Sequence, residues 1–374
     1  MIARDRRAGR ACFAGSASRK EVFDRENGGD GVEVLKRRPR LWALPAAVLA
    51  AVLLAGCGSQ ESSLAPQSHQ GKDIASLFWW MMGGAWIGLG LVVALLVASW
   101  FRRRRRGFGS DTEGPKPGER LATKVVVGLG IVTPIVVMSV IFVIGDILVI
   151  PTTQAPAANA TKLTIHVIGH QWWWEVRYPG TTAVTANEIH IPVRTPVRVE
   201  VSTADVIHSF DVPELNRTID TIPGRLNMIE LYADRTGIYR GQCREFCGLQ
   251  HAHMGFLVFA DPPNVFRRWL ADQERSAATP TGTLAKQGEH FFLTGPCSTC
   301  HTIRGTTAHG YTGPDLTHLA SRTTLAGAMI PNRKGYLAGW IMDSQHIKPG
   351  NEMPDMTITG SELQALLAYL EGLK

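Results

Sequence analysis

Two long apolar stretches dominate the first half of the chain, at residues 77–100 and 124–150. Each is longer than the roughly 20 residues that a helix needs to cross the hydrocarbon core of a bilayer. The first begins with an aromatic collar at residues 78–80, which is typical of a membrane–water interface. The pattern therefore predicts a transmembrane hairpin, in which Pro134 is tolerated if neighbouring helices satisfy the freed backbone carbonyl. A buried helix pair in a soluble protein is the alternative.

The loop between the two stretches indicates the orientation of this hairpin. Residues 101–123 contain five consecutive arginines, 102–106, directly after the first stretch. Positive residues beside a span prefer the cytoplasmic side. We therefore expect the loop inside the cell, and both ends of the hairpin on the outer face, including an N-terminal segment at residues 57–76.

The period of the hydrophobic pattern changes after the hairpin. Within residues 151–275, short runs such as 163–167 and 197–201 alternate apolar and polar positions or are rich in β-branched residues, and turn signals separate them. Many short strands without intervening helices predict an antiparallel sandwich or barrel of about one hundred residues.

The last part of the chain, residues 283–374, is predicted to be a small and mostly helical domain. It follows an Ala/Thr/Pro/Gly linker at residues 276–282. Thr359 and Glu362 fit a capping box at the start of a terminal helix. Five leucines at helical spacing give this helix one apolar stripe. They are Leu363, Leu366, Leu367, Leu370 and Leu373.

Composition and charge narrow the possible partners. The 374 residues exceed one ordinary domain, and an apolar share of 45% supports both cores and membrane helices. Residues 1–56 hold 11 basic and 6 acidic residues, and so contribute +5 of the formal net charge of +7. The rest of the chain is nearly neutral outside the arginine run, which argues against a nucleic-acid partner.

Cys57 follows a stretch of sequence that is typical of a signal segment. It follows a basic stretch at residues 36–40, an apolar run at 41–54 and a small-residue pair. This order resembles a bacterial lipoprotein signal that is cut before the cysteine. We therefore expect residues 1–56 to be a leader and the mature chain to begin at a lipid-modified Cys57. An uncleaved helix with an incidental cysteine is the alternative.

The first metal motif lies in one loop near the end of the β region. It is made of Cys243, Glu245, Cys247, His251 and Met254. The two cysteines are close enough in sequence for both thiolates to bridge two ions, and thiolate, imidazole and thioether ligands together suit copper. His208 is expected to join them from a separate strand junction. A zinc site of two cysteines and two histidines is the alternative, although methionine and the interposed glutamate add nothing to structural zinc.

The second metal motif is typical of a covalent c-type haem. It consists of Cys297, Cys300 and His301, with the histidine as the proximal iron ligand. Met353 is the expected sixth ligand, and Met356 is its rival. A backbone carbonyl at Gly313 and Pro314 is expected to orient the proximal histidine. The four cysteines of the two motifs leave no pair for a structural disulfide, and two redox-metal motifs in tandem indicate that the protein moves electrons.

The two metal motifs resemble those of subunit II of cytochrome c oxidase, a member of the haem-copper oxidase family, in the form that carries a fused cytochrome c. The same resemblance extends to residues 169–174, 205–213 and 222–225. The resemblance covers nearly everything after Cys57 and is highly specific. It implies a cupredoxin-like domain that holds two copper ions, with both cysteines as bridges. By the same resemblance, His208 and Met254 bind one ion, and His251 and the backbone carbonyl of Glu245 bind the other.

The resemblance also implies roles for residues around the copper pair. It directs the side chain of Glu245 toward a magnesium ion at the boundary with subunit I. It matches Trp172 to the aromatic residue through which electrons reach the copper centre, although packing is the alternative. Trp173 and Trp174 are expected to serve packing. His170 and His253 are expected to be structural or surface residues.

The function implied is that of the electron-accepting subunit of a cytochrome c oxidase in the bacterial cell membrane, with the copper and haem domains on the outer face. The chain would take electrons at one covalent haem c from a reduced cytochrome or a quinol–cytochrome reductase complex. It would pass them through the copper pair to subunit I, where dioxygen is reduced to water with proton pumping. Other oxidase subunits are further partners, and the chain itself has no catalytic residue.

One departure from the family concerns protons. Many members carry a glutamate early in the second span, whereas residues 125–134 contain no carboxylate, so that Glu119 or the partner chain would have to substitute. Two other functions are compatible with parts of the sequence. One is a membrane-tethered electron carrier or copper-delivery protein. The other is a nitrous-oxide-type reductase, for which the sequence shows no sign of the histidine-rich catalytic domain.

Overall fold

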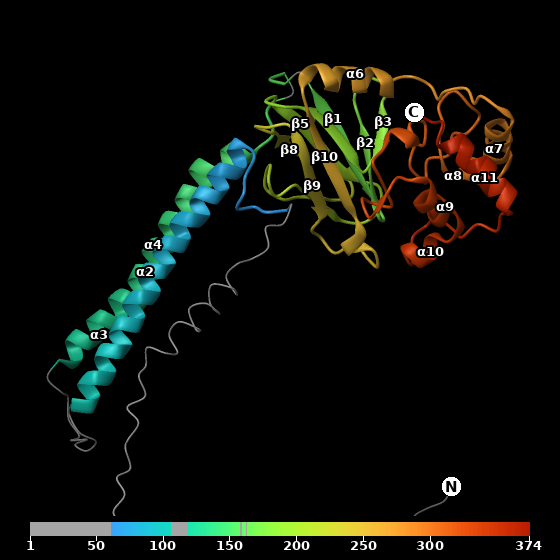
Figure 1. Cartoon of the computed structure of the whole chain (residues 1–374). Helices are drawn as coiled ribbons and strands as arrows, with labels where there is room; N and C mark the ends of the chain where they lie inside the picture. Colours follow the sequence, from blue (N-terminus) through green and yellow to red (C-terminus); the bar gives the residue numbers. More distant parts are fainter. Residues whose placement is uncertain (1–60, 106–117, 158, 162) are drawn as a thin grey trace, which may run out of the picture. The chain divides into compact units, whose positions relative to one another are not determined.

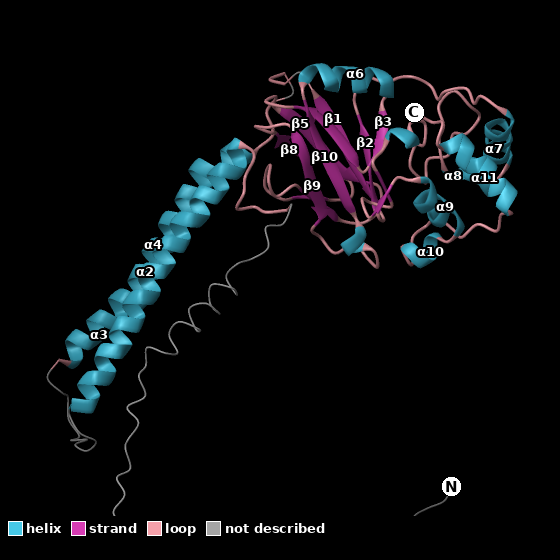
Figure 2. Cartoon of the chain, viewed as in Figure 1, coloured by secondary structure: helices cyan, strands magenta, loops and turns pink. Residues whose placement is uncertain are grey.

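The computed structural model describes residues 61–105, 118–157, 159–161 and 163–374. The predicted leader, Cys57 and residues 106–117 of the connecting loop lie outside them. Three parts follow one another along the described chain: a pair of long apolar helices, a two-sheet β domain and a small helical domain (Figures 1 and 2). The order of these parts is the one that the hydrophobic pattern predicts.

Two helices are long and apolar enough to cross a membrane, judged by length and composition. The first is α2, which is unbroken over His69–Arg105. The second combines α-helical segments with two π-helical turns, η1 and η2. Its pieces are α3 (Glu119–Val127), η1 (Gly128–Val132), α4 (Thr133–Ile144), η2 (Gly145–Val149) and α5 (Ile150–Thr153). The first π-helical turn directly precedes α4, whose second residue, Pro134, lacks the N–H that a regular helix would need there.

The start of α2 lies outside the predicted span, because its first turns are polar and pack against the β domain. The Ser68 hydroxyl donates to the carbonyl of Leu215. Gln70 is buried, and its side chain donates to the Glu230 carboxylate at 2.6 Å. These hydrogen bonds hold the polar residues before position 77 in the helix, which therefore begins at His69 and not at the apolar stretch.

The β domain consists of two five-stranded sheets (Figure 2). The first sheet has the order β3-β2-β1-β5-β8, and the second has the order β4-β10-β9-β6-β7. The strands of the first are β1 (Thr164–His170), β2 (Trp173–Arg177), β3 (Val184–Ala186), β5 (Val197–Thr203) and β8 (Asn227–Leu231). Those of the second are β4 (Glu188–Pro192), β6 (His208–Asp211), β7 (Ile219–Thr221), β9 (Gly237–Cys243) and β10 (Gly255–Asp261).

The purely antiparallel arrangement predicted for this region is wrong. β1 pairs with β5 in parallel, with Ile165 opposite Val199, and β10 pairs with β4 in parallel. The other strand pairs are antiparallel. Period-2 alternation gives the face that each strand buries, but it does not fix the direction of the neighbouring strand.

The core of the β domain lies between the two sheets. β1 and β5 bury every second side chain, as alternation requires. At its centre Trp174 is fully buried and makes edge contacts with Phe210 and Phe256. Trp174 is therefore a packing residue, as expected from the sequence. Helix α6 (Pro263–Gln273) then packs on the domain through Phe266.

The final domain builds its own apolar core from short helices. It contains α7 (Thr283–Thr294), α8 (Cys297–Cys300), α9 (Lys334–Met342), α10 (Ser344–Ile347) and α11 (Gly360–Leu370), a short η4 turn (Leu319–Ser321), and the strand pair β11 (Thr324–Leu325) and β12 (Ile330–Pro331). The predicted capping box is present, since Thr359 and Glu362 hydrogen-bond each other reciprocally at the start of α11. The leucine stripe of this helix joins the core, with Leu366 only 2% exposed.

Candidate metal centres

Two sulfur-containing clusters in the structure correspond to the two sequence motifs. The first lies at one end of the β domain, where several connections meet. Cys243 ends β9, and the loop after it carries Cys247, the short 3-10 helix η3 (His251–His253) and Met254, which precedes β10. His208 begins β6, which pairs with β9, so this histidine comes from a separate strand as predicted.

The side chains of this first cluster lie at ligand-like separations. The Sγ atoms of Cys243 and Cys247 are 3.9 Å apart. From the Sγ of Cys247, the Nδ1 of His251 is at 3.6 Å and the Sδ of Met254 at 3.8 Å. On the other side, the Sγ of Cys243 lies 3.9 Å from the Nδ1 of His208 and 3.3 Å from the carbonyl oxygen of Glu245.

These separations fit a metal site built from soft ligands. Two atoms bound to one ion at about 2.0–2.3 Å are separated by roughly 3.3–3.8 Å at a tetrahedral angle. Cys243, Cys247 and Met254 are all buried, and no carboxylate belongs to the cluster of metal-ligating groups found among the described residues. A buried methionine within contact of a cysteine favours copper over structural zinc, because zinc makes no use of a thioether.

The electrostatics around the cluster favour one ionised thiol, that of Cys243, and a fixed imidazole. The two thiols titrate as a pair: their mutual hydrogen bond lowers the pKa of Cys243 to about 4 and raises the pKa of Cys247. Burial lowers the pKa of His208, but the hydrogen bond that its Nε2 donates to Asp205 at 2.8 Å and the contact of its Nδ1 with Cys243 together outweigh burial, and the net pKa is raised. A carboxylate on the far nitrogen orients a ligating histidine and makes it more basic.

Glu245, the predicted magnesium contact, presents an exposed side chain beside this cluster. Its neighbours Phe246 and Leu249 are strongly exposed as well. The two predicted structural histidines have protein partners: His170 lies against Trp173 and Glu175, and His253 hydrogen-bonds Gln250 at 2.6 Å.

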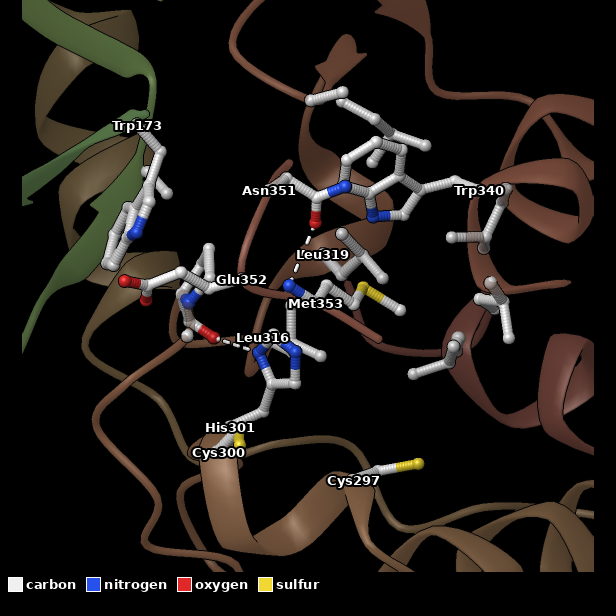
Figure 3. Close-up of a pocket in the computed structure, with 18 of the residues that line it drawn as sticks. Trp173, Cys297, Cys300, His301, Leu316, Leu319, Trp340, Asn351, Glu352 and Met353 are labelled. Carbon is white, nitrogen blue, oxygen red and sulfur yellow. Dashed lines mark hydrogen bonds between the residues drawn. The ribbon is translucent and has the colours of Figure 1, made fainter. Parts of the chain in front are cut away.

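The second cluster surrounds an apolar cavity of about 330 Å³ (Figure 3). Cofactor pockets commonly enclose about 300–1,000 Å³ and are lined mainly by apolar side chains. Cys297 and Cys300 frame the short helix α8, and His301 follows directly after it. Met353 lines the same cavity, as Figure 3 shows. The helices α7 and α11 contribute Phe292, Leu366 and Leu370 to its wall.

His301 is held in place and in its neutral form. Its Nδ1 lies 2.8 Å from the carbonyl oxygen of Pro314, which confirms the expected role of this carbonyl. Burial lowers the pKa of the imidazole and so favours its neutral form. The close approach also requires Gly313, because a Cβ there would lie 2.5 Å from the Cε1 of His301.

Both candidate sixth ligands line the haem cavity. The segment around Met353 is fixed by its backbone, since the Met353 amide donates to Asn351 at 2.8 Å and its carbonyl accepts from Gln345 at 2.9 Å. Met356 also lines the cavity and is partly buried. The residues present therefore fit a covalently held haem, with either methionine within the same enclosure.

The two clusters share a wall. Trp172 lines the haem cavity, and its Nε1 donates to the carbonyl of Cys247 at 3.1 Å. Gln171 donates to the same carbonyl at 2.7 Å. Trp173 lines the cavity too, and its ring stacks on His170 with a centroid distance of 4.3 Å. Trp172 is only 8% exposed, so one tryptophan contacts a predicted copper ligand and the haem cavity at once.

Two residues that shape these sites escape the motif patterns. Asp205 contacts His208 from within the same segment, residues 205–213, and a carboxylate three residues before a ligating histidine is the signal that could have identified it. Lys348 is buried between the two clusters, and its hydrogen bonds within the described part of the chain go to backbone oxygens. Nothing in the local sequence distinguishes this lysine from an exposed one.

Two family models match the chain, in separate regions. The model for the periplasmic domain of cytochrome c oxidase subunit II matches residues 181–260, and the model for cytochrome c matches residues 285–374. The first region contains the copper-type cluster, and the second contains the haem-type cavity.

Curated relatives cover more of the chain than these models do. Cytochrome c oxidase subunit 2 of Alkalihalophilus pseudofirmus is 34% identical over 241 residues, covering 64% of this chain and 70% of that protein. The protein of the same name from Bacillus subtilis is 30% identical over 297 residues, covering 76% and 83%. Among solved structures, the periplasmic domain of subunit II of the cytochrome oxidase of Bradyrhizobium japonicum is 35% identical over 30% of this chain and 92% of that one, with a TM-score of 0.29.

Proposed function

Since the chain belongs to the subunit II family of cytochrome c oxidase and carries a cytochrome c domain, we propose that it accepts electrons in the cytochrome domain and delivers them through the copper domain to subunit I. As a family member it is a component of an oxidoreductase complex with an electron-transfer role. The order of the steps, the electron donor and the residue roles are part of the proposal. A reduced cytochrome or a quinol–cytochrome reductase complex is the proposed donor.

The two cofactors, when bound, each supply a centre that exchanges single electrons. Cys297 and Cys300 would hold one haem covalently, with His301 and Met353 toward its iron. Cys243 and Cys247 would bridge two copper ions, with His208 and Met254 on one ion and His251 and the Glu245 carbonyl on the other. These ligand sets are complete, so dioxygen reduction and the proton pumping coupled to it are assigned to subunit I.

The single observation that carries this proposal is the shared wall. Trp172 lines the haem cavity and donates to the carbonyl of Cys247, a predicted bridging ligand. An aromatic ring in contact with both sites supports its role as the residue through which electrons reach the copper centre. Trp173 lies beside it on the cavity wall, where its ring is supported by His170.

The membrane arrangement is also part of the proposal. The two apolar helices would span the bilayer of a bacterial cell, with residues 101–123 inside and the copper and haem domains outside. Residues 276–282 would serve as the linker between the two outer domains. The exposed side chain of Glu245 would reach a magnesium ion at the boundary with subunit I.

The proposal is tested on the oxidase complex purified in detergent. We expect one covalent haem c and two copper ions per chain, an electron paramagnetic resonance signal shared by two copper nuclei, and co-purification of a large haem-containing subunit I. Replacing a bridging ligand, Cys247→Ser, should abolish the copper signal and leave haem attachment intact, because the haem cavity has its own core. His253→Gln, in the same loop, is the matched control and should keep both.

Three results would contradict this proposal. The first is zinc in place of copper in fully loaded protein. The second is loss of the haem spectrum in Cys247→Ser, which would contradict the division into two domains. The third is a stable chain without any oxidase partner, which would instead favour a membrane-tethered electron carrier.

A further inference from the structure

Lys348 lies between the haem cavity and the copper loop. It follows α10 in the cytochrome domain and is 3% exposed. Its ammonium donates to three backbone carbonyls, those of Trp172 at 2.7 Å, His253 at 2.9 Å and Ala326 at 3.1 Å. The first two acceptors belong to the copper domain, and the third belongs to the cytochrome domain. The side chain itself also lines the haem cavity.

The three acceptors match the three donors of an ammonium group. Each N–H finds one carbonyl oxygen, and none of the contacts described for Lys348 is an ion pair. Burial lowers the pKa of Lys348 to about 7, whereas three carbonyl oxygens at hydrogen-bond distance favour the form that carries three N–H donors. A buried polar group with all its partners in place ties together the segments that supply them.

One of these segments has an unusual backbone. Ala326, Gly327 and Ala328 all have positive φ, at 56°, 77° and 58°. Non-glycine residues rarely adopt this conformation, which persists where surrounding contacts hold it. The turn brings the Ala326 carbonyl to Lys348, and the Gly327 carbonyl accepts from the Gly255 amide of β10 at 3.1 Å. A Cβ on Gly327 would lie 2.7 Å from the carbonyl oxygen of His253.

Other contacts also join the two domains, and one of them lies in the copper loop, where Gln250 donates to the carbonyl of Pro349 at 2.7 Å. The buried Glu188 of β4 accepts from the backbone amides and hydroxyls of Thr323 and Thr324, at 2.6–3.4 Å. Arg304 donates to Thr182 at 3.0 Å and to the carbonyl of Glu274 at 3.3 Å. Lys348 differs from them because it contacts Trp172 directly and also lines the haem cavity.

We propose that Lys348 is a positioning residue that fixes the cytochrome domain on the copper domain at Trp172, and thereby sets the rate of electron transfer between haem and copper. In this transfer one electron leaves the reduced haem and reduces the oxidised copper pair, with no bond made or broken. The inference rests on the proposed function, because it assumes that both sites are loaded and that electrons pass in this direction.

The test uses the purified oxidase with three variants of the full chain. Lys348→Met keeps the length of the side chain but removes the donors, and Lys348→Arg retains a charged donor group. Lys334→Met, at the exposed start of α9, is the matched control. Four quantities are measured: haem and copper content, the haem midpoint potential, the rate of protease cleavage within residues 276–282, and the rate of haem-to-copper electron transfer after rapid reduction of the haem.

We expect Lys348→Met to be cleaved about tenfold faster than wild type, because the loss of one buried hydrogen-bonding group shifts such equilibria by about that factor. Electron transfer should slow by a similar factor at unchanged haem and copper content. The haem potential should fall, because a positive charge beside the cavity favours the reduced state. Lys348→Arg should recover part of each effect, and Lys334→Met should behave as wild type.

The outcomes separate the inference from the function on which it rests. If wild type transfers electrons from haem to copper and Lys348→Met does so at the same rate, the positioning role is wrong and the proposed function stands. If Lys348→Met and Lys348→Arg change the cleavage rate, the electron-transfer rate and the haem potential to the same extent, the role of the charged donor is wrong. If wild type contains both metals and shows no transfer between them, the proposed function itself fails.

Discussion

Two methionines share the haem cavity with His301, and they differ in how their backbones are held. Met353 has both its amide and its carbonyl engaged by side chains of the cytochrome domain, through Asn351 and Gln345. No such anchor is described for the backbone of Met356. A sixth ligand held by a fixed backbone keeps its position in both oxidation states of the iron, which favours Met353.

We therefore expect Met353→Ala to alter the reduced absorption spectrum of the haem and to lower its midpoint potential, because a thioether ligand raises that potential. Met356→Ala is the matched control and should leave both nearly unchanged. Spectra and redox titration of the two variants decide the assignment. The opposite pattern, with an altered spectrum only in Met356→Ala, would transfer the sixth position to Met356.

The spacing of a motif predicts residues whose role requires one particular type of side chain, such as a metal ligand. It misses residues whose role many types of side chain could fill. The sulfur and imidazole groups of both clusters were recognised because metal binding restricts their type and order, and the structure brings them together. Lys348 and Glu188 could not be recognised, because their partners are backbone atoms or hydroxyls that lie, except for Ala326, roughly a hundred residues or more away in the sequence. Any sequence supplies backbone carbonyls, so no pattern marks them.

At the scale of elements, the crossing of α7 and α11 depends on one glycine. A Cβ at Gly288 of α7 would lie 2.0 Å from the carbonyl oxygen of Ala365 and 2.9 Å from the Cβ of Tyr369, both in α11. The backbones of the two helices therefore approach more closely than any larger residue allows. Leu366 and Leu370 of α11 reach the haem cavity as a result of this approach.

We expect Gly288→Ala to destabilise the cytochrome domain by roughly 1–3 kcal/mol, the usual cost of inserting atoms into a packed site. Each kcal/mol corresponds to roughly 4–8 °C in the thermal midpoint of a domain of about this size. The thermal midpoint is measured from the loss of the haem circular dichroism signal on heating. Gly335→Ala in α9, where no atom lies within 4 Å of the added Cβ, is the control and should not lower the midpoint. Equal midpoints for the two variants would contradict the close crossing.

The elements that could be predicted are those whose signals are local. The capping box of Thr359 and Glu362 and the leucine stripe behind it occupy consecutive turns of one helix, and both are present. The parallel pairing of β1 with β5 could not be predicted, because strand direction depends on how distant segments connect. The polar start of α2 was missed for a similar reason, since Gln70 finds its partner Glu230 far along the chain.

At the scale of the whole molecule, the order of the apolar helix pair, the β domain and the helical domain follows from the hydrophobic pattern alone. The contacts between the β domain and the helical domain cannot be predicted in this way, because the residues that make them belong to no recognisable sequence motif. The mature start of the chain is a further whole-molecule prediction, and Cys57 lies outside the described residues.

We expect the intact mass of the purified chain to correspond to residues 57–374 with a lipid attached at Cys57, because the preceding apolar run is short for a span and ends in small residues. Mass spectrometry of the detergent-solubilised chain measures this. Cys57→Ala should abolish the lipid mass and leave the copper and haem contents unchanged. A mass that includes Met1 would rule out the lipoprotein leader.

Under the proposed function, the burial of Trp172 would affect how the oxidase is supplied with electrons. Its side chain is covered, and its carbonyl is occupied by Lys348 of the same chain. A diffusing carrier that would otherwise collide with this patch would meet the tethered domain instead. The last transfer to copper would then be unimolecular, because tethering holds the local concentration of the internal donor high whatever the abundance of the carrier. The abundance of the carrier would then affect only the rate at which the haem of the tethered domain is reduced again.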